Sequence, residues 1–407
     1  MIAPKMSDFA MVGSFLGFVI GMAARPLGAF FFGLEGDCRG AKQCLLRSGY
    51  LMGVVTSIIA VVPGYDILGA GTPSLNIFLR LLQGFAIGGT YSSIALLAYD
   101  AAPENSKGRF TCFIQVAAPA GYLSSLAAVL VVKIFLGDVA FHAWGWRVCF
   151  IAAVALLYFI RKIQLTNCEF ELQPLFSTRM EVLKSVVNSF KTRKSFAKAF
   201  FFFILPVTGV VGLTTFMGNV YQLFFMQTLL KVDPILSKFI LALSSLIYLP
   251  TFFFWGVLSD RMNKTKMILI GISLSTVFIL PYFMLAEYVG ESLKNQGTLI
   301  GLHTWLMIIF GSAISTIVVA AYAPLISFLG ELLPQAYRNF LLANAYHFGF
   351  GLLGSVAQLM GTFFLLERTS LYGTIITTTI LSALGIVTIL LYLWRNQNSH
   401  IRGMKEN

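Results

Sequence analysis

The sequence predicts an all-α polytopic membrane protein, from its composition and from the length of its apolar runs. Of the 407 residues, 57% are hydrophobic and only 11% are charged, whereas soluble domains carry about 25% charged residues. The runs reach about 20 residues, the length of a membrane-spanning helix, and exceed the roughly 10-residue strands of a membrane barrel. Because lipid offers the backbone no hydrogen bonds, helices are the expected structure.

These apolar runs follow one another along nearly the whole chain, separated by charged or turn-forming residues. Each is long enough to cross the hydrocarbon core once. We therefore expect about eleven membrane helices. They are predicted over residues 9–32, 45–63, 75–98, 111–136, 146–160, 196–225, 235–258, 267–288, 302–329, 340–366 and 371–394.

The charge pattern predicts an orientation in the membrane. The formal net charge is +12, and the basic residues concentrate in alternate loops and in the C-terminal tail. This alternation is what the positive-inside rule requires, so it explains the charge better than nucleic-acid binding does. The rule places the C-terminus in the cytoplasm, and an odd number of spans then leaves Met1 outside.

A charged turn occurs twice, each time between two apolar runs, and indicates two related halves. Glycines let the two flanking helices approach closely. The aspartate could brace one helix against another in one state and release it in the next, or it could cap the helix that follows. The turn residues are Gly33, Asp37 and Gly40 in the first copy and Gly256, Asp260 and Arg261 in the second.

The basic segment Arg161–Ser195 is the natural boundary between these halves. We predict an N-terminal bundle of five spans over residues 1–162, a cytoplasmic loop over 163–196, and a C-terminal six-helix bundle over 197–407. Between Met180 and Phe190, apolar residues recur at helical spacing with basic residues among them. This spacing predicts a helix on the inner membrane surface, with a solvated loop as the alternative.

Four further motifs carry a family resemblance. They are Arg25-Pro-Leu-Gly28, Arg80-Leu-Leu-Gln-Gly-x-x-x-Gly-Gly89, Trp144-Gly-Trp-Arg147 and Glu331-Leu-Leu-Pro-x-x-x-Arg338. Together with the repeated turn, they resemble the major facilitator superfamily, and within it the metabolite:proton symporter family. That family contains the proline/glycine-betaine, α-ketoglutarate, citrate and shikimate carriers. The resemblance implies two six-helix bundles around a central substrate site, working by alternating access.

The sequence departs from this family pattern in two places. Met1 falls where the family has the outer loop before its second helix, so we expect the first helix to be missing. In the family that helix carries acidic residues implied in proton coupling. Thr90 also stands where the family usually has a glutamate after the glycine pair.

Ionisable residues inside the predicted spans are the main site candidates, because a charge at bilayer depth costs at least about 2.5 kcal/mol. Arg80 resembles the superfamily's arginine on the fourth helix, implied in proton transfer; the alternative is a side chain that snorkels to the surface. Arg25 could hold a substrate carboxylate or form a structural pair. His347 could relay protons or be a hydrogen-bonded packing residue.

Polar residues in the spans extend this list of candidates. Gln83, Tyr91 and Gln115 could line a polar cavity, and tyrosine rings can hold a quaternary ammonium by cation–π attraction. Asp100 and Arg109 flank the next inner loop, resemble the family's acidic and basic pair there, and could bridge to the Asp37 turn.

The function we predict is secondary transport of a small zwitterionic osmolyte or metabolite, similar to proline or betaine, coupled to protons. The alternatives are an organic-acid proton symporter and a truncated paralogue without transport activity. Motifs for phosphate-binding loops, zinc hydrolases and nucleophile elbows do not occur, so an enzyme is not expected. We expect no cofactor, metal or nucleic acid, and a location in the bacterial inner membrane. The sequence does not indicate the oligomeric state.

Overall fold

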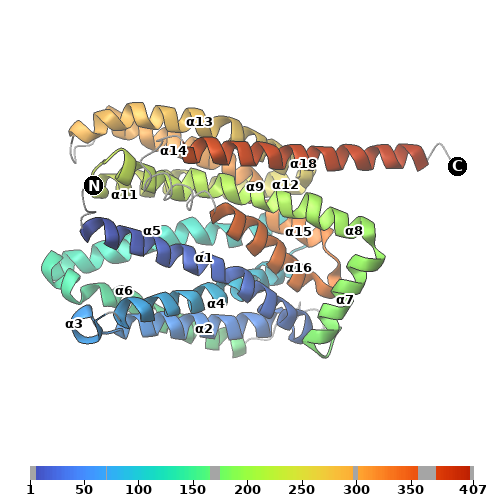
Figure 1. Cartoon of the computed structure of the whole chain (residues 1–407), viewed down its shortest axis with the longest axis horizontal. Helices are drawn as coiled ribbons and strands as arrows, with labels where there is room; N and C mark the ends of the chain where they lie inside the picture. The colour runs from blue at the N-terminus through green and yellow to red at the C-terminus, as the bar shows by residue number, and fades with distance from the viewer. Residues whose placement is uncertain (1–5, 70, 166–174, 297–300, 356–372, 404–407) are drawn as a thin grey trace. The chain divides into compact units, whose positions relative to one another are not determined.

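The computed structural model describes residues 6–69, 71–165, 175–296, 301–355 and 373–403, and its regular elements there are all helices (Figure 1). The predicted all-α fold is confirmed. Within these ranges, eight helical segments are long and apolar enough to cross a membrane. They are Ala41–Val61, Gly71–Ala101, Glu104–Phe141, Lys194–Gln227, Pro234–Arg261, Lys264–Ser292, Leu302–Leu332 and Ile375–Arg395.

The other predicted spans have different outcomes. Helices also form over the runs 9–32 and 146–160, as α1 (Met6–Arg39) and α6 (Val148–Leu165). The run 340–366 begins in α16 (Arg338–Asn344) and the π-helix η7 (Ala345–Leu353), and its end lies outside the described residues. The helix expected near Met180–Phe190 is confirmed as α7 (Arg179–Thr192).

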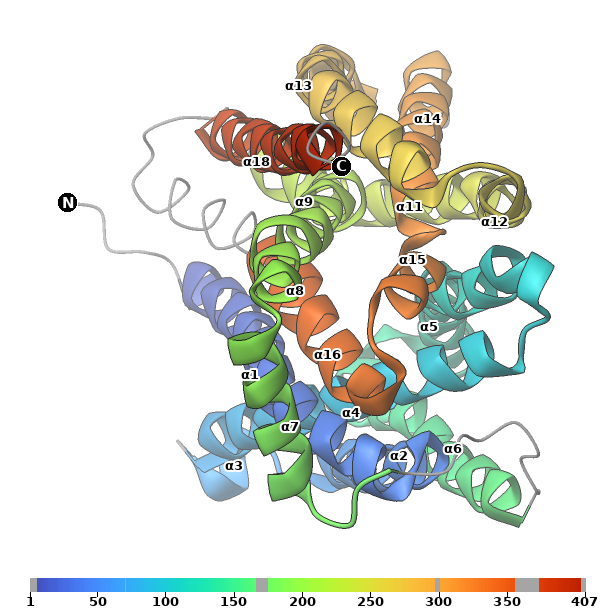
Figure 2. The same ribbon diagram turned by 90° about the vertical axis from the view of Figure 1, so that its right-hand side faces the viewer.

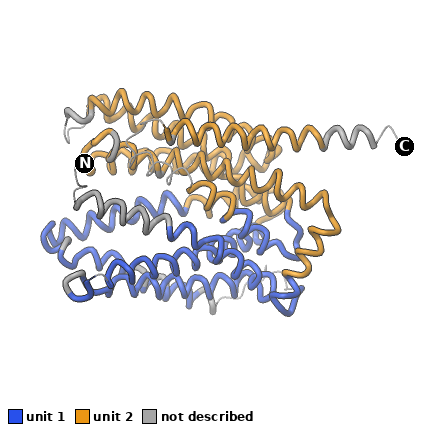
Figure 3. The backbone as a smooth tube through the Cα atoms, in the orientation of Figure 1, with its two compact units in different colours: residues 1–101, 117–182, 333–347 blue, residues 102–116, 183–332, 348–407 orange. Residues whose placement is uncertain are grey.

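The chain divides into two compact units that exchange short segments (Figure 3). Unit 1 comprises residues 1–101, 117–182 and 333–347, and unit 2 comprises 102–116, 183–332 and 348–407. Most of the predicted N-terminal bundle lies in unit 1 and most of the C-terminal bundle in unit 2. Each unit thus includes the start of one helix from the opposite half of the sequence: α5 (Lys107–Ala143) begins in unit 2, and α16 lies in unit 1.

Unit 1 is built around α1 and α4 (Gly71–Ala101), which pack along each other, with α16 beside both (Figure 2). Glycines set this close approach. A Cβ on Gly28 would lie 1.9 Å from the carbonyl oxygen of Phe85, and one on Gly84 equally close to that of Gly21. Small residues four apart on one helix face allow backbones to touch in this way. The short α3 (Tyr65–Leu68) and α2 (Ala41–Val61) complete this side of the unit.

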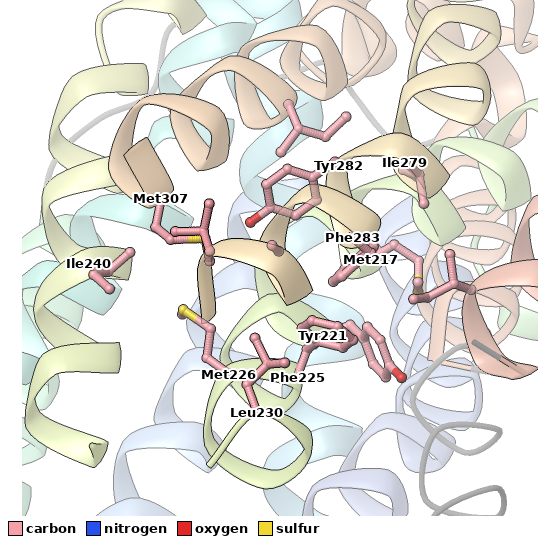
Figure 4. Packing of buried hydrophobic residues seen from close by; sticks show 14 of the residues in the cluster. Met217, Tyr221, Phe225, Met226, Leu230, Ile240, Ile279, Tyr282, Phe283 and Met307 are labelled. Carbon is pink, nitrogen blue, oxygen red and sulfur yellow. The ribbon is translucent and has the colours of Figure 1, made fainter. Parts of the chain in front are cut away.

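Unit 2 has an aromatic core between α13 and a helix that contains π-helical turns (Figure 4). The Phe283 ring lies 4.9 Å from Phe225 and 5.5 Å from Tyr221, edge to face in both pairs. Such pairs each contribute about 0.5–1.5 kcal/mol beyond the area they bury. The elements of the unit are α8 (Lys194–Ala199), η3 (Phe200–Ile204), α9 (Leu205–Thr215), η4 (Phe216–Tyr221), α10 (Gln222–Phe224), η5 (Phe225–Leu229), α11 (Pro234–Tyr248), α12 (Thr251–Arg261), α13 (Lys264–Gln296), α14 (Leu302–Tyr322), α15 (Leu325–Leu332) and α18 (Gly373–Gly403).

Candidate functional site

Asp37 caps a helix that lies far away in the sequence. Its two carboxylate oxygens accept backbone hydrogen bonds from Asn339 (3.0 Å) and Phe340 (2.9 Å), at the start of α16. The helix that directly follows the turn, α2, has Gly40 at its N-cap, with φ +89° and no side-chain cap bond. The turn therefore connects α1 to the N-terminus of α16, where unpaired N–H groups favour a carboxylate.

Glycines on the same face of α1 make this capping possible. A Cβ on Gly36 would lie 1.7 Å from the Asn339 side-chain nitrogen, and one on Gly33 would lie 2.9 Å from the Phe340 Cα. Gly33 and Asp37 are four residues apart, and residues at that spacing share one face of a helix. The two glycines let α16 approach α1, and Asp37 accepts hydrogen bonds from the first backbone amides of α16.

The second turn repeats this arrangement in unit 2. Asp260 accepts backbone hydrogen bonds from Gly108 (2.6 Å) and Arg109 (3.0 Å) at the start of α5. Gly256, one helical turn earlier, faces Cys112, whose Sγ would lie 2.7 Å from a Cβ there. A 3₁₀ turn that follows a proline precedes each capped helix: η1 (Glu104–Ser106) before α5, and η6 (Gln335–Tyr337) before α16.

Burial sets the protonation of the first turn. The Asp37 side chain is almost fully buried, and burial raises the pKa of its carboxyl from 3.8 to about 8. The two backbone hydrogen bonds and the charge of Arg338 lower the pKa, but they offset only part of the desolvation.

Ion pairs lie beside both turns. Arg338, the first residue of α16, is 3.5 Å from Asp100 and lies over the Tyr99 ring. Asp100 thus reaches the helix that Asp37 caps. Arg109 contacts Asp260 through its backbone amide. In unit 2, Lys264 pairs with Glu331 at 2.5 Å, while the Arg261 side chain is exposed.

Sequence reasoning missed Glu35, which the structure buries between arginines. Its side chain is 2% exposed and forms ion pairs with Arg47, with Arg179 at 2.6 Å and with Arg39 at 3.5 Å. The only signal in the sequence was its spacing of four residues from Arg39, because Arg47 and Arg179 lie in other helices.

A second group of candidates meets inside unit 1. The His347 ring is fully buried, and neither ring nitrogen has a hydrogen-bond partner among the described residues. The ring lies edge-on to Tyr91 (6.0 Å between centroids) and to Tyr346 (5.1 Å), and the two tyrosine rings stack at 3.9 Å. Arg25 lies within electrostatic range of His347. We refer to Arg25, Tyr91, Tyr346 and His347 as the α1–α4–η7 cluster.

The remaining candidates lie elsewhere. Arg80 donates to the Gln83 side-chain oxygen (3.0 Å), and Gln83 donates to the Thr56 hydroxyl (2.8 Å), which links α4 to α2. Thr90, in the position of the family glutamate, donates to the Ser48 hydroxyl (3.0 Å). Gln115 belongs to unit 2, where its fully buried amide donates to the Tyr322 carbonyl (3.2 Å).

Two aspartate-capped helix starts and a set of long apolar helices together define a polytopic membrane protein with an internal repeat. The family model described as Major Facilitator Superfamily matches residues 2–286 and 204–402. The chain belongs to the major facilitator superfamily. It is thus an integral membrane protein of a transporter family and not an enzyme.

Three transporters are similar in sequence to this chain over most of its length. The shikimate transporter of Escherichia coli (strain K12) is 28% identical over 290 residues, covering 70% of this chain and 64% of the relative. A putative proline/betaine transporter of Staphylococcus haemolyticus (strain JCSC1435) is 25% identical, covering 65% and 56%. The alpha-ketoglutarate permease of Escherichia coli (strain K12) is 26% identical, covering 67% and 62%. The chain thus matches less than two thirds of the length of these relatives.

A solved structure shares the fold. A proton:xylose symporter superposes with a TM-score of 0.67 at 14% identity, covering 97% of this chain and 88% of that one. At this identity, the likeness concerns the fold alone.

Proposed function

We propose that this chain is a secondary transporter that moves a small carboxylate-bearing metabolite by alternating access, coupled to protons. Membership of the superfamily supports transport as the activity. The names of the similar proteins support the substrate class, because shikimate, proline, betaine and α-ketoglutarate all carry a carboxylate. We place the protein in the bacterial inner membrane with its C-terminal tail in the cytoplasm, on the basis of its basic loops.

The α1–α4–η7 cluster is the observation that carries this proposal. Arg25 supplies a guanidinium, which can bind a carboxylate through two parallel hydrogen bonds. His347 supplies an imidazole whose two nitrogens have no hydrogen-bond partner among the described residues, and the neutral ring has one nitrogen that can accept a proton. A carboxylate-binding cation beside a proton acceptor is the minimum that a proton-coupled carrier of anions or zwitterions needs.

Two substrate classes fit this cluster. A zwitterion similar to proline or betaine is the first candidate, because the Tyr91 and Tyr346 rings offer aromatic faces that attract an ammonium group. An organic acid is the second, and the positive charge of Arg25 favours it. In either case, the Asp37 and Asp260 turns act as gates that hold a helix start in one state and release it in another.

Uptake by proteoliposomes tests the proposal. Radiolabelled shikimate, proline, betaine and α-ketoglutarate are offered in turn to the reconstituted full chain under an imposed pH gradient. We expect one class to accumulate, and we expect Arg25→Gln to lower its uptake at least tenfold while Arg25→Lys retains part of it. Failure of all four substrates to accumulate, or full uptake by Arg25→Gln, would overturn the proposal.

The role of His347 has its own test. We expect His347→Gln to retain exchange of labelled for unlabelled substrate but to lose accumulation driven by the pH gradient, because exchange needs no net proton movement. His303→Gln, which changes a histidine outside the cluster, is the matched control and should keep both. Gradient-driven accumulation by His347→Gln would assign proton coupling to another group.

A further inference from the structure

We propose that Arg39, Arg47 and Arg179, held by Glu35, form a binding site for the phosphate of an anionic phospholipid headgroup. The three guanidiniums come from three different helices and converge on one carboxylate. Arg179 donates to one Glu35 oxygen at 2.6 Å, and Arg47 and Arg39 contact the other. All four residues belong to unit 1.

The charges of this cluster do not balance. One carboxylate faces three permanently charged guanidiniums, so two positive charges remain. Each guanidinium has five N–H donors, more in total than the Glu35 carboxylate can accept. Glu35 is only 2% exposed, whereas the side chains of Arg39, Arg47 and Arg179 are 52%, 47% and 38% exposed. The acid therefore lies beneath the arginines, and their spare donors face outward, where an anion can reach them.

Two other acids lie near the cluster, and each has a different role. Asp37 accepts the first backbone N–H groups of α16, and it carries little charge at neutral pH because burial raises its pKa to about 8. Glu181, in the first turn of α7, accepts the backbone N–H of Ser177, which precedes the helix, at 3.0 Å. The carboxylate of Glu181 reduces the excess positive charge around Arg179 but does not cancel it.

An apolar stripe on α1 leads to the arginines and identifies the anion as a lipid. Leu27, Phe31, Glu35 and Arg39 follow one another at intervals of four, along one helix face. Leu27 is 66% exposed and Phe31 is 40% exposed, and the Arg179 guanidinium lies 4.0 Å over the Phe31 ring. An acyl chain can lie along this stripe while its headgroup phosphate meets the guanidiniums. A free phosphate would gain nothing from Leu27 and Phe31, which is why a lipid fits better.

Binding of a short-chain lipid tests this site. The full chain in a neutral detergent is titrated with dihexanoyl phosphatidylglycerol, with dihexanoyl phosphatidylcholine, and with inorganic phosphate, and the retained ligand is counted by native mass spectrometry. We expect saturable binding of phosphatidylglycerol at least tenfold tighter than that of phosphatidylcholine. Arg39→Gln and Arg179→Gln should each weaken it about fivefold, because a basic residue near an anionic lipid contributes about 1 kcal/mol.

Arg193→Gln is the matched control, because Arg193 is an exposed arginine that forms no ion pair with a described residue. We expect it to bind phosphatidylglycerol as the wild type does. Arg39 is the most exposed of the three arginines, so Arg39→Gln keeps the test valid if Arg179→Gln fails to fold. Unchanged binding by Arg39→Gln, or equal affinity for the two lipids, would overturn the proposal. Tighter binding of phosphate than of phosphatidylglycerol would assign the site to a free anion and overturn the lipid as its source.

Discussion

The Asp37→Asn variant should become more stable than the wild type as the pH rises. The Asp37 carboxyl has a pKa near 8 in the folded protein, because burial raises it from 3.8. A group whose folded-state pKa lies above its unfolded value contributes most stability when both states are protonated. That contribution is lost as the pH rises towards the folded-state pKa. The asparagine does not titrate, so the difference between the two proteins isolates this single group.

The size of the effect follows from the shift. Between pH 5 and pH 8, the unfolded carboxyl is ionised while the folded one is still largely protonated. Each pH unit in that interval changes the free energy of unfolding by about 1.4 kcal/mol. Across this interval, the free energy of unfolding of Asp37→Asn should therefore rise by about 4 kcal/mol relative to that of the wild type. Below pH 4, it should be the less stable protein by about 1 kcal/mol, since its amide nitrogen cannot accept the second backbone hydrogen bond.

Urea unfolding in a mild detergent, followed by tryptophan fluorescence at each pH, measures this difference. Asp37→Ala is the matched control, because it also does not titrate but loses both hydrogen bonds to α16. It should follow the same pH trend as the asparagine variant, about 1 kcal/mol lower in stability throughout. A constant or growing advantage of the wild type with rising pH would show that Asp37 is ionised when folded, and would refute the reasoning.

Four other substitutions, one of them a control, test the packing, a helix cap and an ion pair. Gly88→Ala should cost about 1–3 kcal/mol of unfolding free energy, because its Cβ would lie 2.4 Å from a backbone oxygen of α1, whereas Gly121→Ala, with nothing within 4 Å, should be neutral or slightly stabilising in the same urea titration. Asp260→Ala should lose about 1–3 kcal/mol with its two backbone bonds to α5, measured by urea unfolding at pH 7. Arg338→Gln should lose about 3 kcal/mol, because Arg338 and Asp100 are only 16% and 13% exposed and the change removes one partner of a mostly buried ion pair. A loss of about 1 kcal/mol or less in the same assay would show that the pair contributes little to holding α16.

Much of the helical architecture could be predicted because composition and periodicity act locally. The lengths of the apolar runs predicted the helices, and the Gly-x-x-x-Asp spacing in both halves predicted two equivalent turns. The partners of these turns could not be predicted. Asp37 meets Asn339 and Phe340, some three hundred positions along the chain, and a spacing in one helix carries no information about which distant helix start will meet it.

The candidate site shows the same limit: the sequence indicated single residues but not which of them would contact one another. Arg25, Tyr91 and His347 were each predicted as single polar residues in apolar spans, where charge and hydrogen-bonding groups are costly. Their assembly with Tyr346 depends on how α1, α4 and η7 pack. The same argument from the cost of polar groups in apolar spans also selected Arg80, Gln83 and Gln115. These residues form hydrogen bonds outside the cluster, because that cost does not indicate where a side chain points.

The two aspartate turns share a sequence spacing and a hydrogen-bonding pattern, yet burial makes them physically different. Asp37 is almost fully enclosed, whereas Asp260 is only half-buried. Releasing α16 would expose the Asp37 carboxyl to water, where its pKa would return towards 3.8 and the proton would leave at neutral pH. Undocking of this helix start is therefore linked to proton release, and by reciprocity a lower pH favours the docked state. The two turns thus share a hydrogen-bonding geometry but differ in how far the aspartate is buried.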